Sequence, residues 1–173
     1  MIQRTDQIEI LHAITERLIS SIDLLNDSNC WLSDQAVPGS MPAGRFAVTV
    51  SVGAGRFPHE YFDGGGVDTL TEDGAIVITP IVSSPADRPK RAWKTIGGRA
   101  QRGDAPTLIQ LKQLILKAML SEDWEPTNES GDAILRDMIS PLDSSAPADV
   151  RVGETVAIAM QIRFSTAFDW SLE

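Results

Sequence analysis

The most regular hydrophobic pattern of the chain lies near its carboxyl-terminal end. From residue 155 to residue 172, apolar side chains fall on even positions except at Thr166, while the odd positions are polar or small. A period of two is typical of a β-strand with one buried face. Fully extended, this segment would measure roughly 55 to 60 Å, whereas a domain of this size is about 40 Å across. We therefore expect either a bend or bulge at residues 165–167, or an end that projects and meets another subunit.

Two other segments show the three-to-four-residue spacing of amphipathic helices. The first covers residues 5–25 and has Asp6 and Glu9 at capping-box-like spacing. The second covers residues 104–122, with Pro106 in its first turn. Their apolar stripes consist of Ile8, Leu11, Ile14, Leu18, Ile22 and Leu25, and of Leu108, Leu111, Leu114, Ile115, Ala118 and Met119.

Further strands are predicted in the middle of the chain. Residues 45–53 alternate and predict a half-buried strand, while residues 67–71 and 75–83 predict a hairpin joined by an Asp73-Gly74 turn. Pro80 favours a sheet edge, or at least a point where its missing donor is tolerated.

Two stretches are less regular. Residues 26–44 lose periodicity and predict a long connection held by Trp31 and Leu32. Residues 132–142 fit a short helix, although their brevity and Pro141 also suit a strand. The whole pattern predicts an α+β fold, with a mixed or mainly antiparallel sheet, two main helices packed on it, long surface loops and a long carboxyl-terminal strand.

The composition indicates a globular protein. A chain of 173 residues, 42% apolar and 23% charged, fits a single α+β domain over residues 1–173. No apolar run is long enough for a membrane span, and residues 1–6 show no signal peptide. The single cysteine, Cys30, has no partner for an internal disulfide, which favours a reducing compartment.

Candidate catalytic and ligand-binding residues are few. His59, Glu60 and Asp63 offer imidazole and carboxylate ligands for a metal, but no second histidine follows at helical spacing, and a solvated loop is the preferred interpretation. His12 and Cys30 are interpreted as structural residues. The glycine clusters are followed by no Gly-Lys-Ser/Thr and match no nucleotide fingerprint. We therefore expect no enzyme, no cofactor and no metal site.

Charge is distributed unevenly along the chain. The formal net charge is −9, yet residues 88–102 hold six of the fifteen basic residues and no acidic one. This basic segment, with Trp93 inside it, could be a solvated loop, a contact with an acidic neighbouring subunit, or a contact with DNA. The acidic remainder of the chain favours a protein contact over DNA. The residues expected at protein interfaces are Arg88, Lys90, Arg91, Trp93, Lys94, Arg99 and Arg102, together with Phe168, Trp170 and Leu172 at the other surface.

The order of these elements resembles the tail terminator, or tail-completion, proteins of long-tailed bacteriophages and gene-transfer particles. The resemblance covers an amphipathic helix, a wandering loop, a strand ending in Arg56-Phe57, a hairpin reaching Ile81-Val82, the basic segment, a helix, and a long final strand with Ile162-Arg163-Phe164 and Phe168-Asp169-Trp170.

The resemblance implies a structural protein of the virion tail or neck, assembled in the host cytoplasm. Such a protein forms a homo-oligomeric ring, a hexamer, which caps the tail tube, stops its polymerisation and docks to the head-side connector or adaptor. DNA would pass through the lumen with at most passive contact, and no membrane is involved. A neck or head-closure adaptor remains an alternative, and a small metal-dependent hydrolase using His59, Glu60 and Asp63 is a less favoured one.

Overall fold

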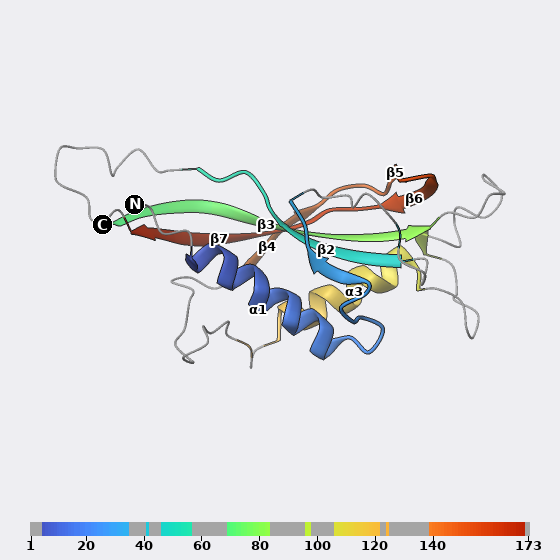
Figure 1. The fold of residues 1–173 in the computed structure, drawn as a ribbon, viewed down its shortest axis with the longest axis horizontal. Helices are drawn as coiled ribbons and strands as arrows, with labels where there is room; N and C mark the ends of the chain where they lie inside the picture. The colour runs from blue at the N-terminus through green and yellow to red at the C-terminus, as the bar shows by residue number, and fades with distance from the viewer. Residues whose placement is uncertain are drawn as a thin grey trace.

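The computed structural model has an α+β fold, which confirms the predicted class (Figure 1). It describes residues 5–34, 41, 46–56, 69–83, 96–97, 106–121, 124 and 139–171. Within these residues, two helices pack on a seven-stranded mixed sheet. The helices are α1 (Thr5–Ser21) and α3 (Leu108–Met119). The strands are β1 (Cys30–Leu32), β2 (Phe46–Val52), β3 (Thr69–Ser83), β4 (Ser140–Ser144), β5 (Ala148–Val152), β6 (Thr155–Ala159) and β7 (Ile162–Ser171).

The long strand β3 is the centre of the sheet. Along one edge it pairs with β2, which in turn pairs with β1 in parallel. Along its other edge β3 pairs first with β7, from Thr69 to Ile78, and then with β6, from Ile81 to Ser83. Strands β4 and β5 form the outer row beyond β7 and β6. Except for the β1–β2 pair, all of these strand pairs are antiparallel.

Pro80 lies where the neighbour of β3 changes from β7 to β6. The residue opposite it, Val48, donates its N–H to the carbonyl of Asn29 at 2.8 Å, on the side away from β3. This pair is therefore not hydrogen-bonded, and the backbone polar groups of Pro80 face the other edge. There the Met160 N–H donates to the Pro80 carbonyl at 3.3 Å. The position of the missing Pro80 N–H therefore faces the interval between the end of β6 at Ala159 and the start of β7 at Ile162.

The outer row of strands, β4 and β5, is interrupted beside the same position. The Ser145 N–H donates to the Gln161 carbonyl at 2.9 Å, and the Gln161 N–H donates to the Ser145 hydroxyl at 3.0 Å. Residues 140–171 thus form one long hairpin that breaks in both arms beside Pro80. Its tip is the Gly153-Glu154 turn, where Gly153 has φ of 60°, a conformation that favours glycine. We call the line through Pro80, residues 160–161 and Ser145 the crease.

Both helices lie on the same face of the sheet, below it in Figure 1. Their predicted stripes form the main core together with the facing side chains of β2, β3 and β7. Arg17 of α1 links the two helices, because its Nε donates to the Ala118 carbonyl at 3.3 Å and its guanidinium lies 5.7 Å from the centre of the Trp124 ring. Ile8, predicted on the buried face of α1, is instead 52% exposed.

Several predicted elements need correction. Asp73-Gly74 is not a turn, because both residues continue β3 and pair with Ala167 and Thr166 of β7. Pro80 is not at a sheet edge, although its missing donor is indeed tolerated. Pro141 belongs to a strand, β4, rather than a short helix. No bulge breaks the last strand at residues 165–167, since the break lies at residues 160–161. The predicted connection at residues 26–44 contains the short strand β1.

The predicted strand at residues 45–53 is confirmed as β2, but it is buried on both faces rather than one. Thr49 and Ser51 on the face away from the helices are 0% and 5% exposed, whereas Val52 at the end is 40% exposed. A small second core on that face joins Ile81 to the β5–β6 hairpin through Val152, Ala157 and Ala159. The β5–β6 hairpin therefore contributes to this second core as well as adding two strands to the sheet.

Helix α3 begins with a complete capping box. The Thr107 hydroxyl accepts from the Gln110 N–H at 3.2 Å, and the Thr107 N–H donates to Gln110 Oε1 at 2.9 Å. These two hydrogen bonds satisfy backbone N–H groups that have no acceptor within the helix at its first turn. Pro106 therefore precedes the N-cap rather than lying in the first turn, as the sequence had suggested.

Replacing Thr107 tests this cap. We expect Thr107→Ala to lower the free energy of unfolding by about 1 to 2 kcal/mol, because the hydroxyl is buried and satisfies a helix N–H. Urea denaturation followed by circular dichroism measures the change. Gln113→Ala, on the exposed side of α3, is the control and should stay within about 0.5 kcal/mol of wild type. Equal losses in both variants would show that the capping box is unimportant.

Candidate functional site

The structure describes part of the two predicted interface surfaces. Phe168 and Trp170 lie in β7, opposite Glu72 and Leu70 of β3. Leu172 and the predicted residues of the basic segment, from Arg88 to Arg102, lie outside the described residues. The same holds for the candidate metal ligands His59, Glu60 and Asp63. The site is therefore built from β7 and the strand that pairs with it.

Residues 69–73 of β3 and 167–171 of β7 form a two-stranded antiparallel ribbon. The register runs from Thr69 opposite Ser171 to Asp73 opposite Ala167. Strand β4 pairs with β7 only as far as Ser165, and the β2 pairing reaches only Ile76 of β3. In Figure 1 the ribbon, made of the green and dark red strands, runs toward the end of the molecule opposite the β5–β6 hairpin.

The outer edge of β7 carries unpaired backbone groups among the described residues. Because Pro80 directs its polar groups toward β6 and β7, the even residues of β3 all face that edge. Their partners, the even residues of β7, face β3 in return. The odd residues Ala167, Asp169 and Ser171 therefore direct their N–H and C=O groups outward. Such an edge can accept another strand.

The neighbouring strand β4 is less suited to strand addition. Strand β4 contains Pro141 and a bulge between Pro141 and Asp143, and Pro147 follows immediately before β5. Prolines, bulges and charges are the means by which proteins block edge pairing. The ribbon edge, with the sequence Ala-Phe-Asp-Trp-Ser, has neither proline nor an observed bulge. Residues 167–171 thus offer a partner an edge that lacks the features protecting β4.

The opposite edge of the ribbon is partly occupied. Arg56 forms a main-chain bridge with Asp73, with N–H to carbonyl distances of 2.6 and 2.8 Å. The chain reaches this bridge through Gly55, where an added Cβ would overlap the Glu72 side chain. Residues 53–56 thus follow β3 past the end of β2.

The ribbon is acidic. Its ten residues include Glu72, Asp73 and Asp169 and no basic residue. In the backbone register Thr71 lies opposite Asp169, so Asp169 pairs two residues away from Asp73. Arg56 supplies one positive charge beside Asp73. The set of acidic positions was missed from sequence because it exists only in the β3–β7 register, and the Asp73-Gly74 pair had suggested a turn.

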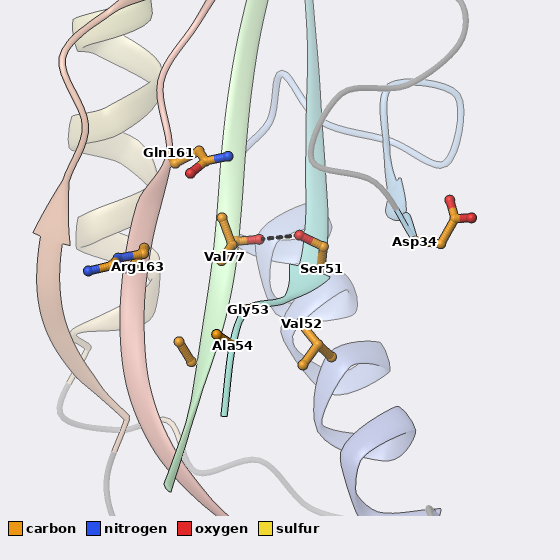
Figure 2. Close-up of a pocket in the computed structure, with 9 residues that line it drawn as sticks. Asp34, Ser51, Val52, Gly53, Ala54, Val77, Gln161 and Arg163 are labelled. Atoms are coloured by element: carbon orange, nitrogen blue, oxygen red, sulfur yellow. Dashed lines mark hydrogen bonds between the residues drawn. The ribbon is translucent and has the colours of Figure 1, made fainter. Parts of the chain in front are cut away.

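A separate groove lies on the sheet face away from the helices (Figure 2). Its volume is about 250 Å³, and Asp34, Ser51, Gln161 and Arg163 are its polar lining residues. The Ser51 hydroxyl donates to the Val77 carbonyl at 3.4 Å. Arg163 is paired with Asp143 of β4, with its Nε donating at 2.8 Å, and this hydrogen bond lowers the pKa of Asp143. Among the described residues that line the groove, no nucleophile and base are in hydrogen-bonding contact.

Two other candidate residues are placed by the structure. His12, interpreted from the sequence as a partly buried structural residue, is instead exposed on α1. Cys30 is buried in the core, and burial raises the pKa of its thiol to about 12, with a smaller contribution from Asp27. A thiol with a raised pKa is a poor nucleophile at neutral pH. Among the described residues no group of three or more metal-ligating side chains is found, and no described helix is long and apolar enough to cross a membrane.

Comparison with solved structures finds a neighbour of low similarity. No protein-family model matches the chain, and no curated protein matches it. A cryo-EM structure of the sheath/tube terminator of an extracellular contractile injection system (PVC, extended state) matches with 10% identity and a TM-score of 0.34. The match covers 93% of this chain and 56% of that one, so the chain spans just over half of the neighbour's length. A TM-score at this level does not establish a shared fold.

The buried thiol allows a direct test of the Cys30 environment. We expect Cys30 of the folded protein to react with a thiol reagent at pH 8 at least about a hundredfold more slowly than in urea, because burial disfavours the thiolate. Rapid labelling of the folded chain would contradict this placement.

The same shift has a consequence for stability against pH. The folded pKa lies above the unfolded value of about 8.5, so the stabilising effect is complete below pH 8.5 and is lost as the pH rises toward 12. Unfolding free energies of wild type and Cys30→Ala should therefore converge above pH 8.5.

Proposed function

We propose that this chain is a structural subunit of a phage-type tail, and specifically a tail terminator. In this role it forms a ring on the end of the tail tube, stops tube polymerisation and docks to the head-side connector. The observation that carries the proposal is the open edge of β7 at residues 167–171, on a ribbon that outruns the neighbouring strands. The element order of the sequence, which resembles tail terminators, gives the sharper assignment.

An isolated two-stranded ribbon is marginally stable in water. The ribbon here contains the sequence positions Phe168 and Trp170, which continue the even series of β7 whose described members Ile162, Phe164 and Thr166 are buried. A partner that adds a strand would satisfy the outward N–H and C=O groups of Ala167, Asp169 and Ser171 and extend the sheet. This supports assembly as the role of the ribbon.

A ring requires each copy to offer two different surfaces, one for each neighbour. The acidic ribbon and the basic segment at residues 88–102 are two such surfaces of opposite charge. In the proposed assembly, a hexamer of the chain contacts the tail-tube protein on one side and the connector on the other, within the virion tail or neck. DNA passes through the lumen with passive contact at most.

A neck or head-closure adaptor of the same particle would use the same kind of surface. The two functions differ in their partner, since a terminator binds the tail tube and an adaptor binds the head-side connector. A metal-dependent hydrolase gains no supporting observation from the described residues.

Measurement of mass and shape in the presence of tail-tube protein tests the proposal. Light scattering and negative-stain imaging should show rings of the purified chain, or rings that form only when tail-tube protein is added, and the added tubes should stop growing. The connector protein, added alone, is the matched comparison. A chain that remains monomeric at high concentration and binds no tube would contradict tail termination, and rings that bind only the connector would favour the adaptor.

A further inference from the structure

Strand β5 is the last strand on its side of the sheet. It pairs with β6 from Ala148 opposite Ala159 to Val152 opposite Thr155, and no described strand pairs with its other edge. Its side chains Asp149 and Arg151 are exposed, and in Figure 1 β5 lies on the outer side of the β5–β6 hairpin. Strand β5 therefore presents an edge along which another strand can lie.

The backbone groups at this edge belong to Asp149 and Arg151. Even residues of β3 direct their polar groups toward β6, so their partners, the even residues of β6, face β3 in return. The odd residues of β6 therefore bond to β5, where their partners are the even residues. Asp149 and Arg151, between those even residues, direct their N–H and C=O groups away from β6.

The two faces of β5 carry different side chains. Val150 and Val152 lie on the face of the second core, where Val152 is buried and Val150 packs against the cluster. Because side chains alternate along a strand, Ala148 shares that face, and Asp149 and Arg151 lie on the other. The strand, Ala-Asp-Val-Arg-Val, contains no proline and consists of one apolar row and one row with an acid and a base.

Both rows match themselves when β5 pairs antiparallel with β5 of a second copy, centred on Val150. Asp149 of each copy then lies opposite Arg151 of the other, and opposite charges in this position stabilise a strand pair. The outward N–H and C=O groups of these two residues meet as hydrogen-bonded pairs. On the other face Val150 lies opposite Val150, and Ala148 opposite Val152, so the second cores of the two copies become continuous.

Other registers lose this match. A shift of two residues in either direction places Arg151 opposite Arg151 or Asp149 opposite Asp149, and like charges directly opposite are destabilising. A shift of one residue brings the apolar row of one copy to the charged face of the other. In-register parallel pairing sets each charge beside its equal. The charges of β5 therefore select the antiparallel register centred on Val150.

From this match we infer that β5 forms a two-fold contact with β5 of a second copy of this chain, which joins their sheets into one. The inference goes beyond the proposed function, because a two-fold contact is complete with two copies and builds no ring. It leaves the open edge of β7 accessible, toward the opposite end of the molecule in Figure 1. A pair of five-residue strands is small for an interface, so the association is reversible.

Disulfide formation at position 150 tests the contact in the full-length chain. Opposite residues of a non-hydrogen-bonded pair have Cα atoms about 4.5 Å apart, a distance that a disulfide can span. Val150→Cys should therefore give a disulfide-linked dimer under mild oxidation, measured on non-reducing gels. Cys30 is buried, so wild type should give none at the same rate.

The matched control for this cross-link is Glu154→Cys at the tip of the hairpin. Glu154 is more exposed than Val150, so random collision would favour cross-linking at the tip. In the proposed dimer the two tips point away from each other, and Glu154→Cys should cross-link at least about tenfold more slowly than Val150→Cys. Equal rates would overturn the inference. Absence of a Val150→Cys dimer would also overturn it and leave the edge to a strand of another protein.

Charge reversal tests the register. Asp149→Arg or Arg151→Asp, each added to Val150→Cys, should slow cross-linking at least about tenfold, because like charges then lie opposite each other. A chain with both reversals should cross-link at the original rate, since opposite charges face each other again. This recovery would also show that neither reversal prevents folding. A doubly reversed chain as slow as the single variants would refute the register.

Mixing the two singly reversed chains gives the sharpest result. One β5 then carries two arginines and the other two aspartates, so the mixture should form mixed dimers in preference to dimers of either chain alone. An affinity tag on one chain distinguishes the products by mass. Equal amounts of mixed and unmixed dimers would contradict the contact.

Further controls reverse a charge elsewhere on the surface. Glu16→Arg on α1 and Lys117→Asp on α3 lie at exposed positions and match the two single reversals in charge. Added to Val150→Cys, both should leave the rate of cross-linking within about twofold of the original. Slowing as large as that of the β5 variants would assign the effect to net charge and refute the specific pairing.

The outcomes separate this inference from the proposed function. Rings that cap tail tubes, formed by a chain whose Val150→Cys variant does not cross-link, would refute the β5 contact and leave tail termination standing. Dimers that depend on the charges of β5, in a chain that never binds tail tubes, would support the contact and refute tail termination.

Discussion

The missing N–H of Pro80 is the constraint on which the arrangement of the sheet depends. A proline inside a central strand removes one ladder hydrogen bond, and sheets accept it only where no acceptor is waiting. Here the neighbouring row is interrupted at residues 160–161, with Met160 bonded to the Pro80 carbonyl and Gln161 bonded to Ser145 of the next row. One absent donor is thus matched by a break in two adjacent rows, which divides the hairpin of residues 140–171 into two halves.

The two halves have different surroundings. On one side of the crease, β5 and β6 form a small second core with Ile81. On the other side, β7 follows β3 for ten residues while β4 covers only the first few of them. The pairing of β4 with β7 reaches Ser165, opposite the first residue of β4, Ser140, and among the described strands the β3–β7 ribbon continues beyond it. Among the described residues, its open edge follows from the length of β3 and the side of β3 on which β7 lies.

Much of the fold could be predicted from local patterns. The stripe from Leu108 to Met119 was correct because a helix buries every third or fourth residue regardless of its partners. The Asp73-Gly74 turn was wrong because pairing with β7 on one edge and Arg56 on the other overrode local turn chemistry. The break at residues 160–161 was missed because Met160 continues the even apolar series, while its cause, Pro80, lies eighty residues earlier. Strand β1 was missed because a strand of three residues is too short to show an alternating hydrophobic pattern.

Only part of the candidate site could be predicted from the sequence. Phe168 and Trp170 were singled out because an extended strand would outrun the domain, and the structure places them in the ribbon. Asp73 joins them only through the β3–β7 register, which local sequence does not contain.

Hydrogen exchange measured residue by residue, at low and high protein concentration, tests the open β7 edge most directly. In the dilute monomer the amides of Ala167, Asp169 and Ser171 should exchange rapidly, whereas those of Phe168 and Trp170, which face β3, should be protected. On assembly, the three outward amides should become protected while exposed amides of β4 remain unchanged. Outward amides that are already protected in the monomer, or that stay unprotected in the assembled state, would contradict the account.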